Sequence, residues 1–244
     1  DANSFIFALK GTKKVNYLIK NADFVITSAP AIENYALNYN KNVIDIPPTL
    51  NHNRYIPKSN YKISGEMVLG YSGSHSTHKY LKSIEPVFVD LLEKGISFKI
   101  LIISNSDFKF DNPNIPVEFY EWELEKESTL ISKMDIGLFP LTDEPWVYGK
   151  RGGKAMLYMA LGIPIVATAI GANLDTFQNN ENSLLVNIND YEGWVYNITL
   201  LLDNLELREK IGKNARKTLE HRFSTVIYQN KYIEILNSLT NNKK

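Results

Sequence analysis

The chain has 244 residues, 44% of them hydrophobic, which is enough for one or two domains with substantial cores. Its 27 Lys and Arg side chains balance 27 Asp and Glu side chains, so no net field attracts nucleic acid or an anionic membrane. The lack of cysteine excludes disulfides, thiolate catalysis and cysteine-ligated zinc. No apolar run reaches the ~18 residues of a membrane span and no signal-peptide pattern opens the chain, so we expect a cytoplasmic protein that binds no nucleic acid.

The N-terminal part of the chain carries too few strands for a sheet of its own. Its pattern predicts, in order, helix 12–21, strand 24–28, helix 31–39 and strand 43–46. Because two strands do not make a stable open sheet, we expect residues 1–57 to be the end of a larger domain. The chain begins at Asp1 without an initiator Met, so we expect a fragment or a processed chain. The polar residues 58–66 predict a linker between domains.

From Met67 onward, strands alternate with helices. This alternation predicts an α/β fold: a Rossmann-like parallel sheet with helices on both faces over residues 67–223, preceded by a partial second α/β domain. We expect residues 224–244 to form a helix that crosses back to the first domain and a disordered tail. The predicted strands are 67–72, 97–103, 117–120, 136–140, 163–168 and 183–186. One predicted helix follows the first of these strands and ends at about residue 94. The other predicted helices span 125–133, 153–161, 191–203, 205–220 and 224–239.

Three basic side chains crowd the start of the predicted helix 153–161, namely Lys150, Arg151 and Lys154. Because the helix dipole already makes this end positive, each cation there costs about 0.3–1 kcal/mol unless an anion is present. The glycines at 152–153 carry no Cβ, so their N–H groups can approach a phosphate closely. A solvated basic loop is the alternative interpretation, since Lys and Arg are common on surfaces.

A second candidate phosphate loop follows the first strand of the larger domain. Residues 72–78, SGSHSTH, join a predicted strand to a helix, and Gly73 and Ser74 can present N–H or hydroxyl donors there. The loop matches neither the dinucleotide fingerprint nor the P-loop. A plain helix cap by Ser74, Ser76 or Thr77 is the alternative, and it is compatible with phosphate binding.

Two further features concern metals and bases. The four histidines, His52, His75, His78 and His221, lack a metal-binding spacing, so we expect no metal site and no cofactor. Tyr120 and Trp122 follow a strand end, where they either flank a nucleotide base or close the core.

Three passages carry a resemblance to a known family: 134–141 (MDIGLFPL), 154–168 (KAMLYMALGIPIVAT) and 171–186, with the helix 207–216 (LREKIGKNAR) in support. From Met67 onward the chain resembles the C-terminal donor domain of GT-B glycosyltransferases of the group 1 family, also called family four. Residues 22–57 resemble the last elements of that family's N-terminal acceptor domain. The match is specific because the passages occur together and in order.

The resemblance implies transfer of a sugar from a nucleotide-diphosphate sugar to a glycan, lipid-linked or small acceptor, usually with retention and without an essential metal. Peripheral membrane association through the N-terminal domain is also implied. Asn173 and Asp175 would then face the donor sugar, although Asp175 also suits the start of a helix. The residues expected at the donor diphosphate are Gly73, Ser74, Lys150, Gly153 and Lys154.

The chain departs from the family pattern at two places. The family often carries two glutamates eight residues apart, the second contacting ribose, and this chain has Gly149 and Leu157 there. The arginine of the first donor-domain loop is also missing, and Arg151 is a candidate replacement. A nucleotide-sugar epimerase and a non-catalytic nucleotide-sugar-binding module therefore remain alternatives. The catalytic residues are unknown; we expect acceptor-side ones to precede Asp1, leaving this chain alone inactive or weakly active.

Overall fold

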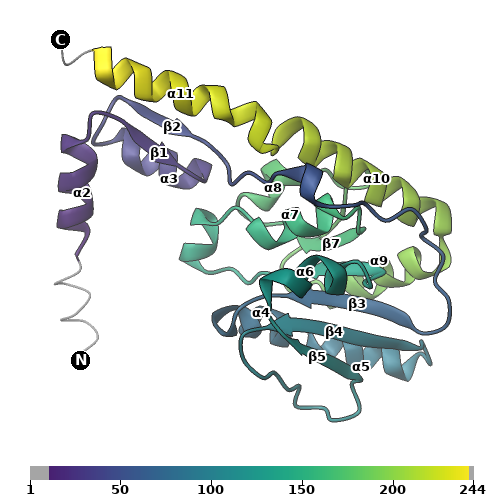
Figure 1. The fold of residues 1–244 in the computed structure, drawn as a ribbon. Helices are drawn as coiled ribbons and strands as arrows, with labels where there is room; N and C mark the ends of the chain where they lie inside the picture. The colour runs from purple at the N-terminus through teal and green to yellow at the C-terminus, as the bar shows by residue number, and fades with distance from the viewer. Residues whose placement is uncertain (1–10, 242–244) are drawn as a thin grey trace.

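A computed structural model describes residues 11–241, in which two parallel sheets are found (Figure 1). The smaller sheet pairs β1 (Val25–Thr27) with β2 (Val43–Asp45), and it is accompanied by α2 (Thr12–Asn21) and α3 (Pro30–Leu37). The larger sheet has six strands in the order β5-β4-β3-β6-β7-β8. Its strands are β3 (Met67–Ser72), β4 (Phe98–Ser104), β5 (Val117–Glu121), β6 (Ile136–Phe139), β7 (Ile165–Thr168) and β8 (Leu184–Val186).

Helices cover both faces of the larger sheet because successive strand side chains point to opposite sides. In β4, Ile100 and Ile102 belong to one core cluster, whereas Leu101 and Ile103 belong to the other. The first cluster is completed by α4 (His78–Ser83), α5 (Glu85–Glu93) and α9 (Tyr191–Asp203). The second is completed by α6 (Leu124–Ile131), α7 (Gly153–Ala160) and α10 (Leu205–Arg222). The predicted α/β fold class is confirmed.

The strand order creates a crevice at the carboxyl edge of this sheet. The chain runs outward from β3 to β4 and β5, then crosses back to β6 and continues through β7 to β8. Loops that leave β3 and β6 therefore turn in opposite directions, and ligands of doubly wound sheets bind at such a switch point. The loop from Gly73 follows β3, and the segment that leads to α7 follows β6.

One predicted helix is wrong in detail. The single helix expected to end at residue 94 is broken at Ile84 into α4 and α5. Pro86 lies in the first turn of α5, where its missing N–H costs nothing, but its ring cannot follow an unbroken preceding turn.

The N-terminal part of the chain is hydrogen-bonded through Leu50 to the start of the last helix, α11 (Thr225–Asn241). This helix runs beside the smaller sheet (Figure 1). The Leu50 N–H donates to the Phe223 carbonyl at 3.0 Å, and the Thr225 N–H donates to the Leu50 carbonyl at 3.2 Å. Residues 55–66 have no regular structure, yet Tyr61 among them is buried. The domain boundaries at 57 and 66 stay predictions. Within residues 11–241, no helix is long and apolar enough to cross a membrane.

A glycine in α10 sets how closely this helix approaches the turn after α7. A Cβ on Gly212 would lie 2.2 Å from the Gly162 carbonyl oxygen and 2.5 Å from the Tyr61 ring. In an ordinary helix interior, Gly→Ala stabilises by about 1 kcal/mol. Here we expect Gly212→Ala to lower the free energy of unfolding in urea by about 1–3 kcal/mol, because backbone cannot move aside easily. Lys217→Ala on the exposed face of the same helix is the control, and a stabilised Gly212→Ala variant would contradict the close packing.

Candidate functional site

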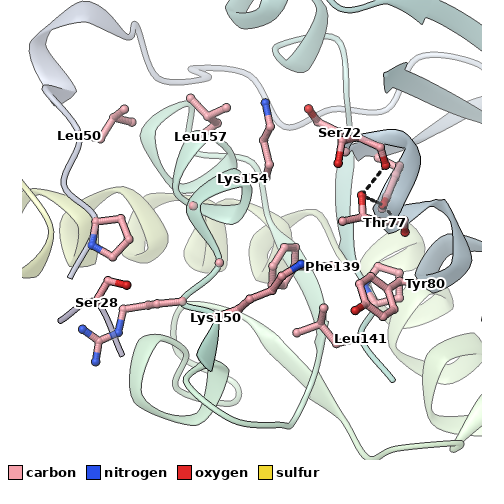
Figure 2. Close-up of a pocket in the computed structure, with 18 of the residues that line it drawn as sticks. Ser28, Leu50, Ser72, Thr77, Tyr80, Phe139, Leu141, Lys150, Lys154 and Leu157 are labelled. Atoms are coloured by element: carbon pink, nitrogen blue, oxygen red, sulfur yellow. Dashed lines mark hydrogen bonds between the residues drawn. The ribbon is translucent and has the colours of Figure 1, made fainter. Parts of the chain in front are cut away.

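A cavity of about 670 Å³ lies at the switch point, between the larger sheet and the N-terminal segment (Figure 2). One wall comes from Ser28, Pro48, Leu50 and Tyr55. The opposite wall comes from the end of β3 and the following turn, from Glu127 of α6, from residues 139–141 after β6 and from residues 149–154 with Leu157. Of the residues predicted to bind a diphosphate, the structure brings Gly73, Ser74, Lys150, Gly153 and Lys154 together here.

The turn after β3 requires a glycine. A Cβ on Gly73 would lie 2.5 Å from the Tyr71 hydroxyl and 2.6 Å from the Thr77 hydroxyl. The Gly73 N–H is already used, since it donates to the Ile103 carbonyl at 3.1 Å. The Ser74 N–H has no acceptor among residues 11–241, so Ser74 is the better donor for a ligand. Burial raises the pKa of Tyr71 to about 12, which keeps its hydroxyl protonated and donating to Thr77.

Lys150 follows the short 3-10 helix η3 (Pro145–Gly149) and holds its ammonium among aromatic rings. Its Nζ lies 3.3 Å from the Trp146 ring centroid and 5.6 Å from that of Tyr80. In the described part of the chain, no carboxylate lies within 4.0 Å of this nitrogen. Burial, and secondarily the charge of Lys79, lowers the pKa of Lys150, and a bound anion would oppose that shift.

Two buried hydroxyl groups at the cavity also lack a partner in the described chain: Ser72 Oγ and Tyr80 Oη. The side chains are 3% and 1% exposed. Because a buried polar group without a hydrogen bond costs about 1–3 kcal/mol, a water or a polar ligand group that reached either hydroxyl would stabilise it. These hydroxyls were not predicted, since nothing in a strand or helix pattern marks a hydroxyl as unpaired.

The first turn of α7 completes the cavity. A Cβ on Gly152 would lie 2.7 Å from the Phe139 ring, whereas Gly153 has open space around it. The N–H groups of a first helical turn have no intrahelical acceptor and carry the positive end of the helix dipole. With residues 149–154 lining the cavity, this turn is suited to bind an anion.

Lys154 is paired with a residue that the sequence interpretation missed. Its Nζ lies 2.6 Å from Glu127 Oε1, and the Trp122 indole N–H donates to the same oxygen at 2.6 Å. Glu127 is only 7% exposed. A signal was present: Glu127 precedes Leu130 and Ile131 by three and four residues, which places it on the core-facing stripe of α6.

Arg151 lines the cavity, but its guanidinium is already paired with two carboxylates. Its Nη1 lies 2.8 Å from Asp45 on β2, and its Nη2 lies 2.9 Å from Asp175 on α8 (Asn173–Thr176). The side chain is 4% exposed. Arg222 also lies 3.4 Å from Asp175. Arg151 therefore ties the smaller sheet to the larger domain.

The two residues predicted at the donor sugar lie apart from the diphosphate residues. Asn173 is buried, and its side-chain amide donates to the Thr168 carbonyl at 2.9 Å. Asp175 is held by Arg151 and Arg222. Neither lines the cavity, so their role at a donor sugar stays a prediction.

The two aromatic residues predicted near the base differ in position. Tyr120 donates to Glu118 at 2.5 Å and lies under Lys133, away from the cavity lining. Trp122 is 40% exposed and is bound to Glu127, which does line the cavity. Contact with a base stays a prediction for both.

No three metal-ligating side chains come together within residues 11–241. His78 is buried and lies 2.6 Å from Ser104 through Nε2, while its ring packs 5.6 Å from that of His75. Burial lowers the pKa of His78. His78 is thus positioned for a hydrogen bond with Ser104, close to the turn that contains Gly73.

The doubly wound sheet, with a cavity at its switch point, defines an α/β protein of the Rossmann-like class. The family model of glycosyl transferases group 1 matches residues 54–218, and the chain belongs to this family. The predicted family resemblance is confirmed, while the family-four label stays a prediction.

Similar proteins agree with this assignment. The chain is 26% identical over 197 residues to the capsular polysaccharide biosynthesis glycosyltransferase CapM of Staphylococcus aureus, covering 73% of this chain and 48% of that protein. Sucrose-phosphate synthase of Thermosynechococcus elongatus superposes with a TM-score of 0.74 at 21% identity, covering 93% of this chain and 61% of the other. Anabaena HepE in complex with UDP and glucose superposes with a TM-score of 0.74 at 16% identity. The superposition covers 92% of this chain and 65% of the other. The chain thus spans about half the length of its curated relative.

Proposed function

We propose that this chain is the donor-binding half of a glycosyltransferase, which moves a sugar from a nucleotide-diphosphate sugar to a glycan or lipid-linked acceptor. The observation that carries this proposal is the Lys150 ammonium, which lines the cavity without a carboxylate within 4.0 Å in residues 11–241. A partly buried cation without such a partner is stabilised by an anionic ligand.

A diphosphate suits the groups around Lys150. The Ser74 N–H and the first turn of α7 add neutral donors to its charge. Negative charge grows on the diphosphate as the glycosidic bond to the donor sugar breaks. Donors and cations fixed at that point bind the transition state more tightly than the ground state, which accelerates the transfer.

The finer features of the reaction follow the family resemblance. We propose transfer with retention, in which fixed cations rather than an essential metal neutralise the leaving diphosphate. CapM is named a glycosyltransferase of capsular polysaccharide biosynthesis, which supports a glycan acceptor. The HepE structure contains UDP and glucose, which supports a nucleotide-sugar donor. Peripheral membrane association stays a prediction.

Calorimetry tests the donor site directly. We expect at least one of UDP, GDP and dTDP to bind this chain about 100-fold more tightly than its own nucleoside, because two phosphate contacts of about 1.5 kcal/mol each amount to this factor. Failure of all three diphosphates to bind would contradict the proposal. With the matching radiolabelled nucleotide sugar and the longer protein, label passing to an acceptor supports transfer, whereas label returning only as an altered nucleotide sugar indicates an epimerase.

A further inference from the structure

The cavity contains a carboxylate where burial makes one costly. Taking an ion out of water costs several kcal/mol unless it is paired and hydrogen-bonded. Glu127 is 7% exposed, and it is the carboxylate that lines the cavity within residues 11–241. Lys154 and the Trp122 indole N–H compensate part of that cost.

Only one of the two carboxylate oxygens of Glu127 receives these stabilising contacts. Both contacts reach Oε1, at 2.6 Å each, and no group of residues 11–241 donates to Oε2. An ionised carboxylate has about four acceptor positions, so capacity remains on a side chain that lines the cavity. The complementary ligand group is a hydrogen-bond donor, and a pair of neighbouring hydroxyls fits a carboxylate well.

The position of Glu127 relative to the proposed diphosphate site selects which hydroxyls those are. Lys150, which precedes α7, extends toward Tyr80 (Figure 2). Lys154 is in the first turn of α7 and lies beside Leu157, which follows it by about one turn. Glu127 pairs with Lys154 and therefore lies on the Leu157 side of the cavity. Leu157 is the position at which the family resemblance implies a ribose-binding glutamate.

We propose that Glu127 of α6 binds the ribose hydroxyls of the nucleotide, in place of the absent carboxylate at Leu157. A carboxylate that accepts from ribose hydroxyls is a recurrent solution in dinucleotide-binding α/β folds. A carboxylate would thus still bind the ribose, but it would come from α6 instead of α7. This inference rests on the proposed function, because it needs a nucleotide in the cavity.

The test compares ribonucleotides with their deoxy analogues. Calorimetry would use whichever of UDP and GDP binds more tightly, its 2′-deoxy and 3′-deoxy analogues, and pyrophosphate. A hydrogen bond to a charged group contributes about 1.5–3 kcal/mol, so we expect the unchanged chain to prefer the ribonucleotide over at least one analogue by about 10-fold or more. In Glu127→Gln this preference should fall below about threefold, while pyrophosphate binds at least as tightly as before, because Lys154 loses its carboxylate partner.

Two further variants make the test specific. Glu125→Gln changes an exposed carboxylate of the same helix and should keep the full preference. The exchange Glu127→Leu with Leu157→Glu should restore it. A Glu127→Gln variant that keeps the preference, or that loses ribonucleotide, deoxynucleotide and pyrophosphate binding equally, overturns this inference alone. If the unchanged chain binds none of UDP, GDP and dTDP, the proposed function fails as well.

Discussion

Replacing Lys150 by alanine is expected to weaken nucleoside diphosphate binding by about 10- to 100-fold and to leave binding of the free nucleoside nearly unchanged. The reason is that this ammonium lines the cavity and has no carboxylate within 4.0 Å in the described chain. A charged contact to phosphate contributes about 1.5–3 kcal/mol, and 1.4 kcal/mol corresponds to a factor of ten. Calorimetry with the diphosphate and with its nucleoside measures both effects.

Lys79 offers the matched control. It is a neighbouring cation, but it is exposed and paired with Glu144. Lys79→Ala should therefore change diphosphate affinity by less than about threefold, since exposed charges are largely screened. Equal losses for diphosphate and nucleoside in Lys150→Ala would reject a phosphate contact by Lys150.

The pH dependence gives a second readout of the same contact. Burial lowers the pKa of Lys150 from 10.5, and a diphosphate favours the charged form. Affinity is then full while Lys150 is protonated, and it falls as pH rises through the lowered pKa, starting below the range of an ordinary lysine. Lys150→Arg keeps its charge over this range, so its affinity should stay flat. A decline of the same shape in both proteins would assign the titration to another group.

The largest expected effect on stability belongs to Arg151. We expect Arg151→Ala to lower the free energy of unfolding by about 3–5 kcal/mol, because removing one partner of a buried ion pair leaves an uncompensated charge. The charge left behind is mainly that of Asp45, whose side chain is 14% exposed. Urea denaturation of the variant and of the unchanged chain measures this loss.

Arg222→Ala is the control for Arg151. Arg222 is 41% exposed and lies 3.4 Å from Asp175, so its removal should cost less than about 1 kcal/mol. Arg151→Lys should give an intermediate stability, because one ammonium cannot span both aspartates in the manner of a guanidinium. An Arg151→Ala chain that unfolds normally but no longer binds a diphosphate would show that Arg151 is a phosphate ligand instead.

Local sequence patterns were sufficient to predict much of the architecture. The nearly continuous apolar run of β4 and the pattern of the predicted helix 125–133 depend only on near neighbours, so both elements could be located from the sequence. The parallel sheet then places loops that follow β3 and β6 at one edge, which is why Gly73 and Lys150 could be predicted to meet. The break at Ile84 was missed although Pro86 marked it.

By itself, the sequence determined the fold class, the family and the edge of the sheet at which cations gather. It could not distinguish Lys150, Arg151 and Lys154, which look alike beside the same helix start. Only the tertiary structure assigned them, leaving Lys150 without a carboxylate partner in the described chain, setting Arg151 between two aspartates and pairing Lys154 with Glu127. The physical reason is that a residue's helix or strand preference is local, whereas its charge partner is supplied by other elements, 24 residues away for Asp175 and 27 for Glu127.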